Sequence, residues 1–362
     1  MSVIRVDITR REITSVNVPD LEKLFHLKRL PLAQAAVEIE FKGISTAAVN
    51  AFRRVSMDEM LGYAFKVPID GFNIELTTDC YMLPQFVNTR ITCIRLRPQI
   101  SPDIVSKLRL KLDVSNKNAT VMAVYAGDLE VYEGSMPDPL FNPTTKIAIL
   151  QPGKRLVING IFISTGYGRD NSVYNVACRG AYTHRDIEQY TDAETREEQG
   201  VAADLSGYKV STLVANPRHH VFTAILPAIT PKLTEARTVF ADVCVNIKER
   251  LRLIMTSVER HAEASSGGIQ YTVIDLEAGL YEGILQVPGE THTIGELLRR
   301  TIYDLVPDVA YIAYTIVSHD RLQISIRHTS DVTKILLQAL TSAIELYDRL
   351  QEGIMAARIG SQ

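Results

Sequence analysis

Apolar and polar residues alternate near both ends of the chain in patterns that predict strands and helices. Residues 36–41 alternate apolar side chains with Glu38 and Glu40, which predicts a half-buried strand. Residues 46–61 then carry apolar side chains at helical spacing. These are Ala48, Val49, Phe52, Val55 and Met60. We expect this helix to end at Gly62, because glycine often follows a helix.

The middle of the chain changes to short strands separated by Pro and Gly turns. The clearest alternation covers residues 108–114, where apolar residues flank Arg109, Lys111 and Asp113. Further strands are expected at residues 121–125, 129–132, 147–150 and 155–163. The polar stretch 184–207 contains few large apolar residues and is expected to be an exposed loop or a short helix.

Two long helices, one in each half of the chain, are expected to carry matching apolar seams. The first begins after Pro231 with Thr234 as its cap, and the second ends at Gly353. Steps of four and three separate the seam residues, which is the spacing of a helix that packs along another helix. The first seam is Phe240, Cys244, Ile247, Leu251, Ile254 and Val258. The second seam is Val332, Leu336, Ala339, Ala343, Leu346 and Leu350.

The last third of the chain combines four expected strands with a shorter helix. The strands are placed at residues 271–276, 281–287, 310–317 and 321–328. Between the strands, Thr293 and Glu296 have the spacing of a capping box that starts a helix. Gly295 in the first turn costs up to about 1 kcal/mol relative to alanine, so we expect another backbone to approach it closely. His292 is expected just before the cap and is interpreted as packing over the helix start, since no second ligand lies at suitable spacing.

Length, composition and charge narrow the class of protein. A chain of 362 residues can form two or three domains with cores of their own. No apolar stretch approaches the roughly 20 residues of a membrane span, and the N-terminus has no signal-like apolar region. The net charge of −3 argues against a protein that grips nucleic acid over its whole surface.

The cysteines do not predict a metal site or a disulfide framework. The four of them, Cys80, Cys93, Cys178 and Cys244, are far apart and form no Cys-x-x-Cys pair. We interpret them as buried free thiols in a reducing compartment and expect no metal and no other cofactor.

Two other functional classes find weak support in the sequence. An enzyme would need a recognisable site, but Gly166 and Gly168 form a lone Gly-x-Gly with no following helix. His219 and His220 are adjacent in an expected strand and would point to opposite faces. Neither feature makes a catalytic centre.

A DNA-binding module is the other alternative that we weigh. Arg90, Arg95 and Arg97 form one small basic group, and Arg299 with Arg300 forms another. No recognised nucleic-acid-reading motif accompanies them, so we interpret them as protein-docking or solvated surfaces.

Residues 290–328 resemble the small alpha-like subunit of multisubunit RNA polymerases, which is archaeal subunit L and its eukaryotic eleventh-subunit counterpart. The family's Glu-Asp-His-Thr-Leu-Gly-Asn stands here as Glu290-Thr-His292-Thr293-Ile-Gly295-Glu296. The family's later Tyr-x-Val-x-His-Pro stands as Tyr314-Thr-Ile-Val-Ser-His319-Asp320, without the proline.

A second resemblance concerns the large alpha-like subunit, which is archaeal D, the eukaryotic third-largest subunit and the bacterial alpha N-terminal domain. The segment Asn50-Ala-Phe-Arg53-Arg54-Val55 is similar to its Asn-x-Leu-Arg-Arg signature, and residues 150–156 and 166–170 resemble its second domain. The family's His-Arg-Leu-Gly is only Asn88-Thr-Arg90-Ile-Thr92 here, and the cysteine clusters of some relatives are absent. Residues 33–352 together resemble the fused assembly subunit of large cytoplasmic DNA viruses, especially the asfarvirus type.

The resemblance implies an α+β fold, an RNA polymerase alpha N-terminal-domain-like pseudo-dimer with two α+β dimerisation modules and a β-rich insert domain. The first module would cover residues 1–97 and 217–262, and the insert would cover 98–216. A linker at 263–269 would lead to the second module at 270–355.

The same resemblance implies a non-catalytic assembly platform whose partners are the two largest polymerase subunits and small assembly subunits. DNA would be contacted only through the complex, and no membrane or small-molecule substrate is expected. A viral chain would act in the host cytoplasm and the virion; otherwise it would be cytosolic or nuclear. Arg53 and Arg54 are expected to dock a large subunit, since guanidinium groups bind carboxylates and carbonyls with fixed geometry. The expected interface residues are Asn50, Phe52, Arg53, Arg54, Leu251, Ile254, His292, Thr293, Gly295, Leu298 and Leu346.

Overall fold

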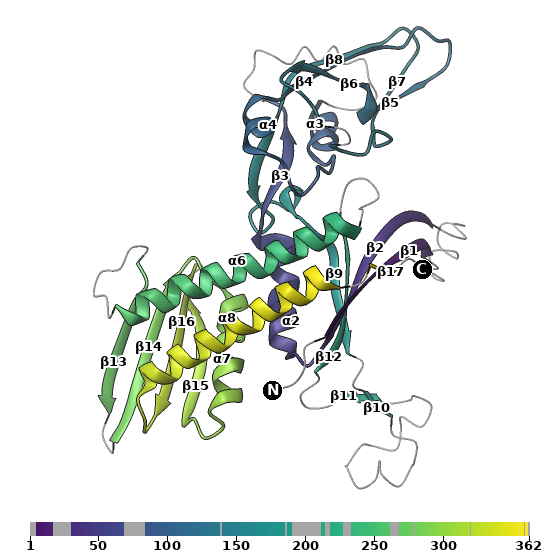
Figure 1. Cartoon of the computed structure of the whole chain (residues 1–362). Helices are drawn as coiled ribbons and strands as arrows, with labels where there is room; N and C mark the ends of the chain where they lie inside the picture. The colour runs from purple at the N-terminus through teal and green to yellow at the C-terminus, as the bar shows by residue number, and fades with distance from the viewer. Residues whose placement is uncertain are drawn as a thin grey trace, which may run out of the picture.

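The chain folds into antiparallel sheets covered and joined by helices (Figure 1). The computed structural model describes residues 5–16, 30–68, 84–137, 140–184, 187–189, 211–213, 218–226, 233–260, 268–276, 279–318, 320–357 and 359–360. Expectations for Cys80, His319, the N-terminal segment before residue 30 apart from residues 5–16, residues 261–267 and most of residues 184–207 fall outside the described residues.

The first sheet has the strand order β17-β1-β2-β12-β9. Its strands are β1 (Arg5–Val16), β2 (Leu30–Lys42), β9 (Cys178–His184), β12 (His219–Ile225) and β17 (Ile359–Gly360). The pairings are antiparallel except that of β17, which lies parallel to β1. The strand expected at 36–41 is confirmed as the end of β2, where alternate apolar side chains are buried.

Helix α2 (Thr46–Arg54) follows β2 and begins where the sequence indicates. Ser45 is its N-cap, and the Ser45 hydroxyl accepts a hydrogen bond from the backbone of Ala48. The helix continues as a π-helical turn, η1 (Val55–Glu59), and the chain then enters strand β3 (Leu61–Lys66). The expected helix end at Gly62 is therefore wrong. Gly62 lies within β3, where a Cβ atom would come within 1.8 Å of the Tyr174 carbonyl oxygen.

The middle of the chain forms a four-stranded sheet of order β3-β8-β4-β6 and a two-stranded sheet of β5 and β7. The five strands expected there are confirmed as β4 (Arg109–Ser115), β5 (Met122–Tyr125), β6 (Leu129–Glu133), β7 (Lys146–Leu150) and β8 (Arg155–Tyr167). Two helices that the pattern did not predict, α3 (Pro84–Thr92) and α4 (Pro102–Lys107), pack beside them. The two short strands β10 (Ile187–Gln189) and β11 (Ser211–Leu213) pair with each other. Strands β3 to β8 and helix α3 contribute to one hydrophobic core.

The last sheet has the order β13-β14-β16-β15 and confirms the four expected strands. They are β13 (Gln270–Leu276), β14 (Leu280–Pro288), β15 (Tyr311–Val317) and β16 (Arg321–His328). Helix α7 (His292–Leu305) covers one face of this sheet.

Two long helices run between the first and the last sheet, and they lie side by side (Figure 1). They are α6 (Leu233–Glu259) and α8 (Val332–Ala356), as the two apolar seams predict. Gly353 lies inside α8 and does not end it. A second hydrophobic core joins buried residues of the first sheet, the last sheet and helices α2, α6, α7 and α8.

Candidate assembly interface

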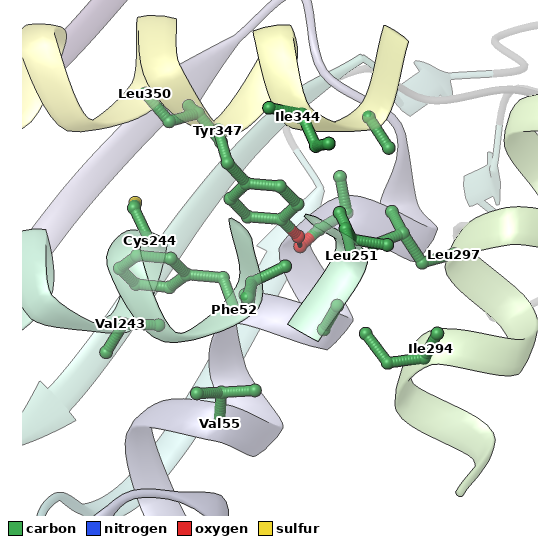
Figure 2. Close-up of a cluster of buried hydrophobic side chains, with 14 of the residues drawn as sticks. Phe52, Val55, Val243, Cys244, Leu251, Ile294, Leu297, Ile344, Tyr347 and Leu350 are labelled. Atoms are coloured by element: carbon green, nitrogen blue, oxygen red, sulfur yellow. Dashed lines mark hydrogen bonds between the residues drawn. The ribbon is translucent and has the colours of Figure 1, made fainter. Parts of the chain in front are cut away.

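Helices α2, α6, α7 and α8 converge on one buried apolar cluster (Figure 2). Phe52 lies at its centre, with ring centroids 5.3 Å from Phe41, 5.5 Å from Phe222 and 5.8 Å from Phe240. Leu251, Ile254 and Leu298 are also at most 1% exposed. Residues that are distant in the sequence are therefore brought together, and Phe52, Leu251, Ile254 and Leu298 among them were expected at an interface.

The sequence predicts the buried residues of the α6 seam completely and those of the α8 seam with one error. All six expected seam residues of α6 are buried. In α8, Leu346 is only partly buried, and the fully buried position is Tyr347, whose hydroxyl donates a 2.8 Å hydrogen bond to the Ala48 carbonyl. The expected seam residues on either side, Ala343 and Leu350, are both buried, so the seam changes at this one position only.

A buried ionic network lies beside this apolar cluster. The Arg250 guanidinium donates to both carboxylate oxygens of Glu290, at 2.8 Å for Nε–Oε1, and to Glu59 Oε2 at 2.7 Å. The three side chains are only 18%, 11% and 5% exposed, respectively. Burial alone would lower the pKa of Arg250, but Glu290 and Glu59 outweigh that effect and raise it. The guanidinium is therefore charged at every physiological pH.

Thr293 joins the same network instead of forming the expected capping box. Its hydroxyl donates to Glu59 Oε1 and accepts a 2.7 Å hydrogen bond from Arg54 Nε. The helix begins at His292 with Thr291 as N-cap, so Thr293 is the second helical residue and its side chain faces η1. The Glu296 carboxylate pairs with Arg299. The capping-box prediction is therefore wrong, because Glu59 and Arg54 engage the Thr293 hydroxyl, whereas Arg299 of the same helix engages the Glu296 carboxylate.

Gly295 is approached closely, but by side chains and not by a backbone. A Cβ atom there would lie 2.6 Å from the Tyr314 ring and 2.8 Å from Leu322 Cδ1. The expectation of a backbone neighbour is therefore wrong. His292 is the first residue of α7 and not the one before the cap; its exposed ring packs on Tyr314 with centroids 5.7 Å apart.

Arg53 and Arg54 lie in different surroundings although they are adjacent. Arg54 is directed into the ionic network, where Nε is also 3.5 Å from Glu59 Oε1. Arg53 is half-buried and makes its hydrogen bonds within α2 and η1, with Nε donating to Asn50 Oδ1 at 3.0 Å and Nη1 reaching the Met57 sulfur at 3.5 Å. Among the described residues, Arg53 Nη2 has no hydrogen-bond partner, so this nitrogen can donate to another molecule.

The basic groups weighed as DNA contacts are largely engaged within the chain. Arg299 pairs with Glu296, and Arg300 pairs with Asp304 at 2.9 Å. Arg95 donates to the carbonyl oxygens of Ser172 and Val173. These pairings fix the arginines against protein groups.

The histidine and cysteine candidates are dispersed. His219 bonds Glu40 at 2.5 Å, whereas His220 bonds His184 at 2.9 Å, so the two adjacent histidines point to different partners. Within the described ranges, no group of three metal-ligating side chains forms a metal site. Of the cysteines expected to be buried, Cys244 is buried, and burial raises the pKa of its thiol, but Cys178 is only partly buried. Cys93 is exposed, so the expectation is wrong for that residue. None of the described helices is long and apolar enough to cross a membrane.

Comparison with known proteins identifies the family. No protein-family model matches the chain. The DNA-directed RNA polymerase RPB3-11 homologue of African swine fever virus, isolate Tick/Malawi/Lil 20-1/1983, is 33% identical over 341 residues, covering 92% of this chain and 91% of that protein. The homologues from the Badajoz 1971 Vero-adapted strain and from isolate Pig/Kenya/KEN-50/1950 match with the same identity and coverage.

The chain belongs to this RPB3-11 family. It is therefore a fused subunit of a DNA-directed RNA polymerase, as the paired sequence motifs predict. The match covers both motif regions, since it spans nearly the whole chain. Membership in a polymerase also means that other subunits of that enzyme are the partners of this RPB3-11-type chain.

The ionic network contains residues that sequence reasoning did not assign. Glu59 and Arg250 carry no motif of their own, and Glu290 was noted only as a letter of the family pattern. Their charges break otherwise apolar helical faces close to seam residues such as Leu251. A charged residue at a position that is predicted to be partly buried was the available signal.

Proposed function

We propose that this chain is the non-catalytic assembly subunit of its polymerase, a platform on which the two largest subunits and small assembly subunits dock. The observation that carries the proposal is the single hydrophobic core to which α2 and α6 contribute from one half and α7 and α8 from the other. A shared core of this kind is expected in a family of fused RPB3-11 subunits, because one chain then supplies both members of a pair.

The proposal includes the pseudo-dimer architecture. The first module comprises residues 1–97 and 217–262, the insert 98–216, the linker 263–269 and the second module 270–355. Each module contributes a short helix and a long helix to the interface. Strand β3 pairs with the insert sheet and β9 with the first sheet, so two strands cross these boundaries. A linker of this length keeps the modules at an effective concentration on the order of millimolar.

The proposed partners and location follow from the family. The large catalytic subunits carry the chemistry, and this chain meets DNA only through the assembled enzyme. The relatives are viral proteins, so we place the chain in the host cytoplasm and the virion. Asn50 and Arg53 are the proposed docking residues of α2, and Arg54 supports them from the ionic network.

Arg53→Ala tests the docking role more cleanly than a double substitution, because Arg54 also holds Thr293. The measurement is affinity purification through the tagged full chain from cells that make the polymerase, with the two largest subunits quantified. We expect reduced recovery of one large subunit, with the thermal unfolding midpoint unchanged. Arg155→Ala, which removes an exposed arginine of the insert, is the matched control. Undiminished recovery with Arg53→Ala would remove this residue from the role.

A further inference from the structure

The charges of the buried network are divided unequally between the two modules. The first module supplies two arginines and one glutamate, Arg54, Arg250 and Glu59, and therefore has one positive charge in excess. The second module supplies Glu290, which balances that charge, together with the Thr293 hydroxyl. Arg53 and Asp58 flank the network on α2 and η1 and cancel each other. Only the pair of unlike modules is neutral.

The apolar contacts provide no comparable discrimination. Helices α6 and α8 present similar stripes of buried aliphatic and aromatic side chains. Such stripes would also accept a second copy of the same module, because hydrophobic burial is not directional. A family built from two related modules therefore needs another feature to choose between like and unlike partners.

Aligning the two short helices at their N-caps shows what a second copy of the first module would present. Ser45 caps α2 and Thr291 caps α7, so Ile44 takes the place of Glu290 and Ala47 the place of Thr293. Arg250 would then face an aliphatic side chain, and Glu59 would lose the hydroxyl that donates to it. A buried ion left without its partner is strongly destabilising.

We propose that this network is a selectivity device: Arg250 and Glu59 accept the second module of the chain through Glu290 and Thr293, and reject a second copy of the first module. The proposal rests on the pseudo-dimer of the proposed function. In this proposal the polar residues of the network select the partner, and the apolar seams of α6 and α8 provide the binding affinity. Errors during assembly, in which the first modules of two chains pair with each other, are thereby disfavoured even where chains are concentrated.

The test uses the full chain with a protease site inserted between residues 261 and 267, so that cleavage removes the tether but keeps both modules in the sample. Native mass spectrometry then counts pairs of two first modules. The wild-type sample should contain unlike pairs only. Arg250→Met with Glu290→Gln leaves each module neutral, and we expect pairs of first modules to rise at least about tenfold. Glu296→Gln with Arg299→Met is the matched control, because it makes the same chemical changes in a more exposed pair on α7.

Glu290→Gln alone keeps the test decisive if the double variant does not fold. The first module then keeps its excess charge, so we expect a lower thermal midpoint without pairs of first modules. Like pairs in this variant, or wild-type levels of like pairs in a folded double variant, would overturn the proposal. Capture of the large polymerase subunits by the uncleaved chain is a separate readout, so failure of the proposed function is recognised independently.

Discussion

The insert and the helical interface bury their apolar side chains in different ways. Leu110, Leu112 and Ile161 lie in a core that joins the insert to the segment before it, including Phe65 and Ile91, and that takes no residue from the second half of the chain. Phe52, Phe240 and Leu298 lie in a core to which both ends of the chain contribute. A core built from one part of the chain can lose stability locally. A shared core makes the stability of segments that lie hundreds of residues apart depend on each other. The difference shows where the chain depends on long-range assembly.

Phe52→Ala should have the largest effect and should reveal the shared core most directly. Removing this fully buried ring costs about 3–5 kcal/mol of unfolding free energy. Hydrogen exchange should then speed up in α7 and α8 as well as in α2. Leu110→Ala, at a cost of about 2–5 kcal/mol, should speed exchange in the insert strands and leave α7 and α8 protected. If α7 and α8 exchanged hydrogen at the same rate in the two variants, this distinction between the two cores would be contradicted.

Gly295→Ala should have an intermediate effect at the interface. The added methyl group gains helix propensity but meets Tyr314 and Leu322 at distances below 3.0 Å. Overpacking of this kind costs about 1–3 kcal/mol. Gly153→Ala in the insert is a control with open space around it, although its positive φ of 74° adds backbone strain. Chemical denaturation measures both, and a stabilised Gly295→Ala variant would contradict the packing argument.

Tyr347→Phe should have a smaller effect that depends on alkaline pH. The substitution removes the hydrogen bond to the Ala48 carbonyl and costs about 0.5–1.5 kcal/mol near neutral pH. Burial raises the pKa of Tyr347 above its ordinary value of 10.0. The resulting stability is fully present below pH 10 and is lost as the pH rises above it, because only the unfolded chain ionises there. The phenylalanine variant should therefore lose less stability between pH 9 and pH 11 than the wild type, as measured by thermal unfolding.

Asp58→Asn should have the smallest effect and the opposite sign at neutral pH. Burial, followed by the neighbouring Glu59 charge, raises the pKa of Asp58 above 3.8. The folded chain therefore binds this proton more tightly, and stability falls as the pH rises through the window above 3.8. The asparagine variant should gain less than about 1 kcal/mol at pH 7, because Asp58 is partly solvated. A larger loss of stability on raising the pH from 4 to 7 in the variant than in the wild type would contradict this cause.

Alternating and helical periodicity located most strands and the long helices, because those elements have one buried face. The α6 seam from Phe240 to Val258 is a complete example. Helices α3 and α4 escaped prediction since they are short and the apolar residues of α3 and α4 do not form a long stripe. The motif around His292 identified the family, although its capping box is not formed.

The polar part of the interface could not be read from local sequence. Thr293 and Glu296 have the spacing of a local cap, but Glu59 and Arg54 compete for the threonine hydroxyl from about 240 positions away in the chain. Whether Leu346 or Tyr347 is the buried residue of α8 likewise depends on its neighbours in α6 and α2, since Tyr347 bonds the Ala48 carbonyl. In both cases residues that are distant in the sequence determine which contact forms, and local residue spacing does not predict such contacts.

The parallel contact between β17 and β1 predicts how the molecule should respond to a pulling force. Ile8 pairs with Ile359 and Thr9 with Gly360, so a late segment of the chain is fastened beside an early one (Figure 1). A force that pulls the two ends of the chain apart acts on this two-residue strand pairing before it acts on α6 or α8. The pairing should therefore separate at low force, and the shared hydrophobic core should unfold only at a much higher force.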